Sequence, residues 1–519
     1  MKVIIVGGVA GGATAAARIR RLDEHAEITV FERSGYISYA NCGLPYYIGD
    51  VITDPEELTL QTPESFFKRF RINMKIHHEV ISIHPECKTV SVKNLENGEI
   101  FEENYDKLIL SPGGGFIGLE LAENLMELGM DVTIVQRPKQ LMNPFDPDMA
   151  SMIHNEMRKH GIKLVLGYTV EGFKGKDNRV DVLLKDNPSL QADMVVLAIG
   201  VTPDTVLAKE AGLELGIKES IVVNDRMETS VPDIYAAGDA VQVKHYVTGN
   251  DALISLAGPA NKQGRIIADN ICGGDSRYVG SQGSSVIKVF DMTAATTGIN
   301  ETNAKKSGLE VDTVILSPMS HAGYYPGGKV MTMKVIFEKE SYRLLGAQII
   351  GYEGVDKRID VLATAIHAGL KATQLKDLDL AYAPPYSSAK DPVNMAGFMI
   401  DNIAKGTLKQ WHLEDMDKIS KDKDVVLLDV RTVGEFSRGH IDGFKNIPVD
   451  ELREQISEIE KGKPVYLICQ SGLRSYIASR ILEGNGYETY NFSGGFRFYD
   501  AVVNDRALIE RAYACGMDY

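Results

Sequence analysis

The sequence predicts an α/β protein of several domains, and three segments of the same kind support that prediction. A short apolar strand, Lys2 to Val6, runs into a glycine-rich turn and a helix from Ala13 to Leu22, and a second strand follows at Glu27 to Phe31. The order of strand, turn and helix recurs near Leu108 and again from Val425. Strands joined through helices in this way build the parallel sheets of α/β domains.

Length and composition narrow the class of protein. A chain of 519 residues is too long for one hydrophobic core and is expected to hold about three or four domains. The net charge of −15 argues against a nucleic-acid partner, which would need a basic face. No apolar run reaches the ~18 residues of a membrane span, and the first residues lack the pattern of a signal peptide, so we expect a cytoplasmic protein without a membrane partner.

The first glycine-rich turn has the spacing of a dinucleotide-binding site. Glycines let the backbone approach a pyrophosphate at the start of a helix, where free N–H groups favour an anion. Glu32 closes the second strand, where it can accept hydrogen bonds from a ribose. The expected contacts in the turn are Gly7, Val9, Ala10, Gly11 and Gly12, with Val9 in the place of the usual middle glycine.

A later segment identifies the first dinucleotide. Thr229 to Ala240 (TSVPDIYAAGDA) resembles the second FAD signature of disulfide reductases that bind two dinucleotides, in which the aspartate, here Asp239, holds the ribitol chain. The resemblance implies FAD as the first cofactor. The further FAD contacts that we expect are Arg33, Val80, Ser111 and Ala257.

The second glycine-rich turn predicts a nicotinamide dinucleotide. Gly113, Gly115 and Gly118 match the full pattern and precede a helix, which makes this a second Rossmann-like domain. Gln136 and Arg137 close the next strand, where an acid usually indicates NAD and an arginine accommodates the 2′-phosphate of NADP. We therefore expect NAD(P)H, with NADPH favoured over NADH.

A cysteine segment carries the most specific resemblance. SYANCGLPY, Ser38 to Tyr46, resembles the active-site segment of the coenzyme A-disulfide reductase group, which has one cysteine where relatives have a pair. The resemblance implies that Cys42 forms a mixed disulfide or persulfide with substrate and is released by electrons from the flavin. The alternative is a structural cysteine in a loop, which is our interpretation of Cys87 and Cys272.

Two tyrosine segments extend the resemblance to a dimerisation domain. HAGYYPG and YAPPYSSAKD, at His321 to Gly327 and Tyr382 to Asp391, resemble segments in which a tyrosine reaches the thiol of the partner subunit. The matching residues are Tyr324 and Tyr382, so the resemblance implies a homodimer. It also implies contacts with a coenzyme A moiety by Arg18, Arg21, Ser38, Asn41 and Lys390, although Arg18 and Arg21 fit a solvated helix face equally well.

The C-terminal segment predicts a sulfur carrier. Cys469 follows an apolar strand, and Arg474 lies five positions later, which is the form of a loop that stabilises a thiolate. Together with Leu427 to Val449, this loop resembles a rhodanese domain, whose cysteine carries sulfane sulfur. A catalytically silent module of the same fold is the alternative. Cys515, near the C-terminus, is either a second sulfur acceptor or incidental.

These segments predict a division of the chain into domains. The FAD-binding domain comprises 1–112 and 229–284, and an NAD(P)H-binding domain, 113–228, is inserted between its parts. An α/β dimerisation domain covers 285–404, a linker 405–423 and the rhodanese domain 424–519.

The chain departs from the resemblance at one junction. In relatives about 45 residues separate the strand that ends the first FAD segment from the second glycine turn, whereas here Ser111, Pro112 and Gly113 run directly into it. One strand, Lys107 to Leu110, would have to serve both sheets, and a parallel crossover needs a dozen or more residues. We expect a flavoenzyme that reduces coenzyme A disulfides, persulfides or polysulfides. The alternatives are an NADH oxidase or peroxidase, and a sulfur carrier on an inactivated reductase.

Overall fold

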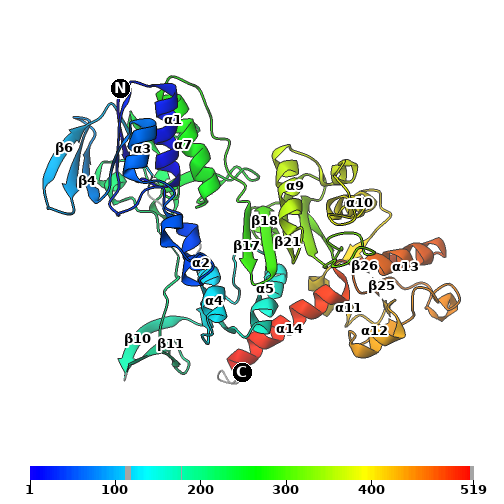
Figure 1. The fold of residues 1–519 in the computed structure, drawn as a ribbon. Coiled ribbons are helices and arrows are strands. Elements are labelled where there is room, and N and C mark those ends of the chain that lie inside the picture. The colour runs from blue at the N-terminus through cyan, green and yellow to red at the C-terminus, as the bar shows by residue number, and fades with distance from the viewer. Residues whose placement is uncertain (112–117, 177, 201, 515–519) are drawn as a thin grey trace. The chain divides into compact units, whose positions relative to one another are not determined.

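The computed structural model describes residues 1–111, 118–176, 178–200 and 202–514. The chain divides into two compact units, Met1–Met130 with Val196–Gly283, and Asp131–Val195 with Ser284–Tyr519. Figure 1 shows helices and strands alternating along the chain in both units. Among the described residues no helix is long and apolar enough to cross a membrane.

A parallel sheet of five strands forms the centre of the first unit. The strand order is β14 (Ile234–Ala236), β7 (Lys107–Leu110), β1 (Lys2–Val6), β2 (Glu27–Phe31) and β3 (Asn73–Lys75). Helices α1 (Ala10–Leu22) and α7 (Ala257–Ile271) pack against each other beside it. Helix α1 begins three residues earlier than predicted, because the Ala13 amide donates to the Val9 carbonyl and the glycines lie inside the first helical turn.

Smaller elements surround this sheet. A three-stranded antiparallel sheet lies beside it, and a short helical segment carries the predicted active-site cysteine. The antiparallel strands are β4 (His78–His84), β5 (Thr89–Asn94) and β6 (Ile100–Asn104). The remaining elements are η1 (Asn41–Gly43), α2 (Leu44–Ile48), α3 (Pro63–Phe70), α4 (Gly118–Glu127), α6 (Val206–Glu210), β13 (Ile221–Val222), β15 (Val241–Lys244) and β16 (Asp251–Ala252).

The second predicted dinucleotide domain lacks a central strand in the described chain. Strand β8 (Thr133–Gln136) pairs only with β9 (Lys163–Leu166) within the described residues. Strand β7, which precedes the second glycine turn, pairs with β1 and β14 in the first sheet. The apolar residues 194–199 form no strand there, and the side chains of Leu197 and Ile199 are 62% and 89% exposed. The shared strand therefore belongs to the first sheet alone.

The rest of this segment is helix α5 (Pro147–Lys159) and an antiparallel sheet of β10 (Val170–Lys176), β11 (Arg179–Leu184) and β12 (Leu190–Ala192). After it, five antiparallel strands form the sheet of the predicted dimerisation domain. Their order is β17 (Ser285–Val289), β18 (Met292–Gly298), β21 (Leu344–Gly351), β20 (Thr332–Glu338) and β19 (Val311–Leu316). Helices α8 (Glu301–Lys306), α9 (Val355–His367) and α10 (Pro392–Ala404) accompany it.

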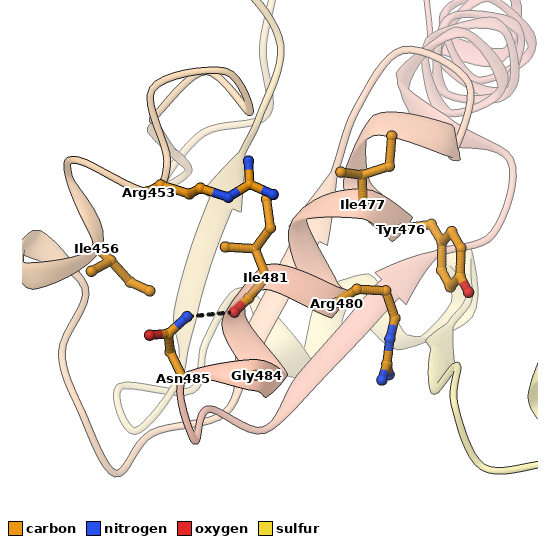
Figure 2. A pocket seen from close by; sticks show the side chains of 8 residues that line it. All are labelled: Arg453, Ile456, Tyr476, Ile477, Arg480, Ile481, Gly484 and Asn485. Atoms are coloured by element: carbon orange, nitrogen blue, oxygen red, sulfur yellow. Dashed lines mark hydrogen bonds between the residues drawn. The ribbon is translucent and has the colours of Figure 1, made fainter.

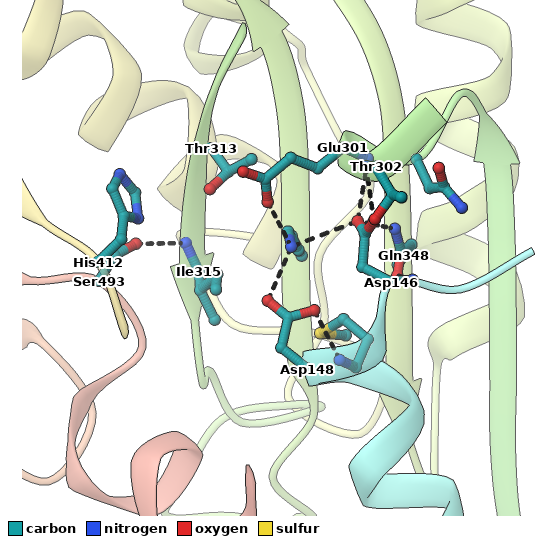
Figure 3. Close-up of polar contacts among 12 residues, drawn as sticks. Asp146, Asp148, Glu301, Thr302, Thr313, Ile315, Gln348, His412 and Ser493 are labelled. Carbon is teal, nitrogen blue, oxygen red and sulfur yellow. Dashed lines mark hydrogen bonds and ion pairs between the residues drawn. The ribbon is translucent and has the colours of Figure 1, made fainter. Parts of the chain in front are cut away.

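A buried lysine joins α5 to this sheet (Figure 3). Lys334 on β20 is 1% exposed, and its Nζ lies 2.7 Å from both Asp148 and Glu301 and 3.3 Å from Asp146. Burial alone would lower the pKa of Lys334, but the three carboxylates raise it, so the lysine stays charged. The start of α5 is therefore fixed to β20 and α8.

The last sheet begins earlier than predicted. Five parallel strands occur in the order β22 (Gln410–Trp411), β26 (Thr489–Phe492), β25 (Val465–Ile468), β23 (Val426–Asp429) and β24 (Lys445–Asn446). The predicted linker, 405–423, therefore contains the first strand of this sheet, in which Trp411 is 2% exposed and packs on Phe492. Helices α11 (Met416–Ile419), α12 (Val433–Arg438), α13 (Leu473–Gly484) and α14 (Gly495–Ala514) complete the domain.

Two polar clusters attach the last domain to the rest of its unit. Asp505 on α14 is 1% exposed and accepts from His154 Nδ1 at 2.9 Å and from Arg158 at 2.5 Å, both on α5. Asp312 on β19 accepts from His412 Nε2 at 3.0 Å and from Gln410 at 3.1 Å. The C-terminal domain is therefore docked through one buried and three partly buried hydrogen bonds.

Candidate functional site

The first glycine turn brings two helices and a strand together without room for side chains. A Cβ on Gly12 would lie 2.0 Å from the Gly7 carbonyl oxygen, and one on Gly11 would lie 2.6 Å from Ser111 Oγ. On α7, a Cβ on Gly264 would lie 2.3 Å from the Gly11 carbonyl oxygen. The glycines are therefore needed for the backbone to turn closely between β1 and α1.

The helix that follows this turn has no side-chain cap. Val9 is the N-cap residue of α1 and makes no capping hydrogen bond, so the first N–H groups of α1 are not satisfied by a side chain. Glu32 follows β2, and its Oε2 accepts from the Gly8 amide at 2.8 Å. An uncapped helix start beside a carboxylate is the arrangement that binds a pyrophosphate and a ribose.

The other predicted FAD residues lie in the same unit. Ser111 and Val80 are buried, and Ala257 is exposed at the start of α7. Asp239 follows Gly238, whose amide donates to Gln263 of α7 at 2.8 Å. Arg33 forms an ion pair with Asp204 at 3.0 Å, which is a structural role besides the predicted contact with FAD.

Cys42 lies on η1, directly before α2, and is exposed. The segment that carries it is joined to the first glycine turn, because the Ser38 amide donates to the Gly8 carbonyl at 2.9 Å. Ser38 has a φ of 47°, which bends the chain between that turn and η1. A solvent-accessible thiol is thereby held next to the predicted flavin site, as an attacking thiol requires.

Tyr46, four residues after Cys42, forms a contact with Glu120 that sequence reasoning missed. Tyr46 on α2 donates to Glu120 Oε1 on α4 at 3.3 Å. The two residues are 74 positions apart, so only the packing of α2 on α4 reveals the pair.

The predicted coenzyme A contacts are not all free to bind an anion. Arg18 pairs with Asp269 at 2.8 Å, which favours its alternative interpretation as a structural residue of α1. Arg21, Asn41 and Lys390 are exposed, and Lys390 belongs to the second unit.

Tyr324 and Tyr382 come together as a pair. Their hydroxyl groups lie 2.7 Å apart, and the side chains are 76% and 45% exposed. The hydrogen bond with Tyr324 raises the pKa of Tyr382. Two segments separated by 58 residues thus present one phenol pair on the surface of the chain.

The predicted nicotinamide site is only partly described. Gly113 and Gly115 lie outside the described residues, and Gly118 begins α4. Gln136 ends β8, and Arg137 follows it with an exposed side chain. These two residues are therefore placed as predicted relative to a strand, but the strand belongs to a sheet of two.

The C-terminal cysteine is enclosed by its own loop. Cys469 is 1% exposed, and its Sγ accepts from the Gly472 amide at 3.1 Å and from Ser475 Oγ at 3.2 Å. The Phe496 amide at the start of α14 donates to the Cys469 carbonyl at 2.8 Å. The loop thus directs donors at the sulfur, which is what a persulfide carrier needs.

Arg474 stabilises this loop through a carboxylate rather than through the sulfur. Its two terminal nitrogens donate to the two oxygens of Glu435 at 2.7 Å each. The hydrogen bonds from Arg474 and Thr432 lower the pKa of Glu435 to about 2. Cys515, the other cysteine of this domain, lies outside the described residues.

A pocket of about 600 Å³ lies along α13 in the same domain (Figure 2). Ile477 and Ile481 line it together with Arg480, whose Nη1 donates to the Thr407 carbonyl at 2.8 Å. No residue of the Cys469 loop, 469–475, lines it, so this pocket is separate from the sulfur site.

A dinucleotide-binding sheet with an adjacent accessible thiol, followed by an antiparallel α/β domain and a thiolate loop, defines a thiol-dependent redox protein. Three family comparisons identify the domains. Pyridine nucleotide-disulphide oxidoreductase matches residues 1–114 and 112–264, its dimerisation domain matches 284–392, and the rhodanese-like domain matches 412–501.

Individual relatives agree with these matches. A coenzyme A disulfide reductase of Staphylococcus aureus (strain JH9) is 35% identical over 439 residues, covering 76% of this chain and 99% of the relative. The crystal structure of reduced Bacillus anthracis CoADR-RHD has a TM-score of 0.94 and 44% identity, covering 97% and 98% of the two chains. An NAD-dependent persulfide reductase from A. fulgidus has a TM-score of 0.89 and 36% identity, covering 96% and 100%. The chain belongs to the pyridine nucleotide-disulphide oxidoreductase family and is an oxidoreductase that carries a C-terminal rhodanese-like domain.

The comparisons also locate the short junction. The family pattern matches in two pieces that meet at 112–114, where the second glycine turn abuts the first segment. For the Staphylococcus relative, 76% of 519 residues is about 394, which is about 45 fewer than the 439 aligned positions. Both observations agree with the missing segment that the sequence predicts.

The family implies FAD and a nicotinamide dinucleotide as cofactors. The residues present fit FAD, because the glycine cradle, the uncapped start of α1 and Glu32 are all in place. They do not fit a complete nicotinamide site, because among the described residues β8 pairs with β9 alone.

Proposed function

We propose that this chain reduces coenzyme A disulfides, coenzyme A persulfides or polysulfides at Cys42, and that its rhodanese domain carries sulfane sulfur on Cys469. The observation that carries the proposal is the exposed Cys42 on a segment hydrogen-bonded to the FAD turn through Ser38. The named reductases at 35% and 36% identity support the class of substrate.

In this proposal the Cys42 thiolate attacks one sulfur of a coenzyme A disulfide, forms a mixed disulfide and releases one coenzyme A thiol. Reduced FAD, when bound, would supply the electron pair that cleaves the mixed disulfide, so that the second coenzyme A leaves as a thiol and Cys42 returns to the thiolate. Exposed cations, Arg21 and Lys390, are proposed to meet the phosphates of coenzyme A.

Further parts of the proposal concern partners and cofactor choice. The chain acts as a homodimer in which Tyr324 and Tyr382 approach the partner's thiol; the matched dimerisation domain and the exposed phenol pair support this arrangement. NADPH is favoured over NADH because Arg137 follows β8. We place the protein in the cytoplasm.

Two cysteine variants test whether Cys42 carries out disulfide reduction and Cys469 carries out sulfur transfer. Cys42→Ser should abolish coenzyme A disulfide reduction and leave the bound flavin spectrum unchanged, because FAD is held by other segments. Cys469→Ser should abolish sulfur transfer from thiosulfate and leave disulfide reduction unchanged. Normal disulfide turnover in Cys42→Ser would refute the proposal, and loss of both activities in Cys469→Ser would show that the rhodanese domain has a structural role only.

A further inference from the structure

Two loops of the dimerisation domain carry the phenol pair of Tyr324 and Tyr382. The first loop, 317–331, follows β19, and the second loop, 378–391, precedes α10. Both phenols are exposed, so packing around the side chains contributes little to their positions. The hydrogen bond of 2.7 Å between the hydroxyl groups therefore depends on the spacing of the two loop backbones.

A buried arginine joins the two loops. Arg358 on α9 is 1% exposed, and its Nη2 donates to the Ser320 carbonyl in the first loop at 3.0 Å. The same nitrogen donates to Asp391 Oδ2, at the end of the second loop, at 3.0 Å, and Nε donates to that oxygen at 3.2 Å. One guanidinium thereby binds a residue four positions before Tyr324 and the residue that ends the loop of Tyr382.

Further hydrogen bonds connect the loops around this guanidinium. Nη2 of Arg358 also lies 3.3 Å from the Tyr386 carbonyl and 3.0 Å from Ser387 Oγ. Ser387 Oγ in turn donates to Asp391 Oδ2 at 2.7 Å, and the Ala322 amide of the first loop donates to the Ser387 carbonyl at 3.0 Å. The second loop is therefore held to the first both directly and through the arginine.

The ends of two helices fix the guanidinium itself. Its Nη1 donates at 3.1 Å to the carbonyl of Gly354, the N-cap residue of α9, whose φ is 68°. A Cβ on Gly354 would lie 2.0 Å from Nη1, so the backbone turns closely around the arginine. Asp391 accepts from the Val393 amide at 3.0 Å and caps α10. A displacement of the guanidinium would therefore disturb both helix starts.

We propose that Arg358 is a positioning residue for disulfide reduction, because it holds the two loops at the spacing at which Tyr324 and Tyr382 act together on the thiol of the partner subunit. The proposal rests on the function proposed above for Cys42 and the phenol pair. The guanidinium reaches three carbonyls and a carboxylate at once, whereas a lysine at this position offers a single nitrogen.

Cross-linking of the two phenols tests the positioning without any turnover. Photo-oxidation with a ruthenium tris-bipyridyl complex and ammonium persulfate joins adjacent tyrosines as dityrosine, and peptide mapping identifies a bond between Tyr324 and Tyr382. We expect this cross-link within one chain of the unmodified protein, and Arg358→Lys should lose most of it. An undiminished yield in Arg358→Lys, or no cross-link in the unmodified protein, would overturn the proposal.

A double-mutant cycle tests whether Arg358 acts through the tyrosines. The FAD-loaded protein is reduced with dithionite, freed of excess reductant and mixed with saturating coenzyme A disulfide while flavin reoxidation is recorded. Arg358→Lys should slow reoxidation about tenfold or more, because the phenols are displaced. In the protein that carries both Tyr324→Phe and Tyr382→Phe, the same substitution should slow it by less than about twofold. Equal slowing in the two backgrounds would mean a general structural role and contradict the proposal.

Arg20→Lys is the matched control. Arg20 is also buried, and its guanidinium donates to the Phe70 and Ala26 carbonyls in the first unit. Any slowing that it causes should be the same with and without the two tyrosine substitutions, and the dityrosine yield should be unchanged. Loss of the cross-link in this control would show that the yield reports a general loosening of the fold, against the proposal.

Ser387→Ala serves where Arg358→Lys does not fold. It removes the hydroxyl between Arg358 and Asp391 and leaves their ion pair. A smaller loss of cross-link and rate, again dependent on the tyrosines, is expected. Unchanged values of both would count against the proposal.

The two measurements separate this proposal from the function on which it rests. If the unmodified protein does not reoxidise its flavin with coenzyme A disulfide, the function proposed for Cys42 fails, even where the cross-link depends on Arg358. If reoxidation proceeds and the protein with both Tyr324→Phe and Tyr382→Phe reacts at the unmodified rate, the phenol pair is not used. The positioning role of Arg358 then fails while the function of Cys42 stands.

Discussion

The two cysteines assigned to sulfur chemistry differ in how the chain presents them. Cys42 is exposed on a short helical segment, whereas Cys469 is 1% exposed and receives hydrogen bonds from Gly472 and Ser475. An exposed thiol can, as the thiolate, attack a bulky disulfide. A sulfur enclosed by donors is suited to hold one additional sulfur atom as a persulfide.

Arg474 is expected to control the Cys469 loop through its geometry rather than its charge alone. A lysine cannot reproduce the two parallel hydrogen bonds to Glu435, so Arg474→Lys should lose roughly 1.5–3 kcal/mol of loop stabilisation. Thiosulfate sulfur transfer should fall about tenfold or more. Arg480→Lys on the same helix is the control in the same assay, and equal rates in the two variants would exclude this role for Arg474.

The side chain of Arg137 provides the test of dinucleotide preference. If it reads a 2′-phosphate, Arg137→Glu should weaken NADPH far more than NADH, because one charge-assisted contact contributes roughly 1.5–3 kcal/mol. Equilibrium binding of each dinucleotide measures this independently of turnover. Lys185→Glu, an exposed change elsewhere, should affect neither, and equal effects of Arg137→Glu on both dinucleotides would remove the argument for NADPH.

Single residues were predictable from sequence where a local motif places them. The spacing of Gly7 to Gly12 with Glu32 predicted a turn and a carboxylate that the structure brings together. The pair of Tyr46 and Glu120 was not predictable, because it depends on two helices from distant segments. The two hydrogen bonds from Arg474 to Glu435 were missed for the same reason. Both residues were placed in the rhodanese domain, but their contact joins helices from segments 39 residues apart.

Some helices and strands were predicted correctly from the sequence and others were not. The strand Lys107–Leu110 was predicted to be required by two sheets at once. It pairs with β1 and β14, so it belongs to the first sheet. The stretch 405–423 was predicted as a linker because it is polar. Its Trp411 nevertheless fills the core of the last sheet, because one buried indole contributes more to docking than the surrounding polar residues oppose.

The docking of the rhodanese domain on β19 should depend on pH. Burial would lower the pKa of His412, but the hydrogen bond to Asp312 outweighs it and raises the pKa above its ordinary value. A raised folded-state pKa contributes stability that is complete below about pH 6.5 and is lost as the pH rises through the folded-state value.

The thermal midpoint of the C-terminal domain should therefore fall as the pH rises above about 6.5. His412→Gln should flatten this dependence, whereas His440→Gln, at an exposed site, should retain it. A steeper dependence in His412→Gln would contradict the assignment of the ion pair.

At the scale of the whole molecule, the short junction affects one sheet, that of the predicted NAD(P)H-binding domain. Among the described residues, the sheets of the FAD-binding, dimerisation and rhodanese domains have five strands each, whereas β8 and β9 form a sheet of two. The sequence predicted this conflict from the junction at Ser111 to Gly113, because the second glycine turn follows directly and one strand cannot complete two sheets. What it could not predict was which sheet would keep the strand.

Restoring the junction should restore electron entry from the nicotinamide side. Insertion of a family-like segment of about 45 residues after Pro112 supplies a strand for β8 at little loop-closure cost. Stopped-flow reduction of the flavin by NADPH should be slow in the natural chain and fast in the extended one. Equal, fast reduction of both would show that the short junction already builds a competent site.

The most direct test of the central claim follows the flavin without any nicotinamide dinucleotide. The FAD-loaded protein is reduced anaerobically with dithionite, freed of excess reductant, and mixed with coenzyme A disulfide while flavin absorbance and released thiol are recorded. We expect the flavin to be reoxidised with release of both coenzyme A thiols from each disulfide consumed, and Cys42→Ser to remain reduced. Reoxidation of Cys42→Ser at the same rate, or no reoxidation of the unmodified protein, would contradict a reductase that works through Cys42.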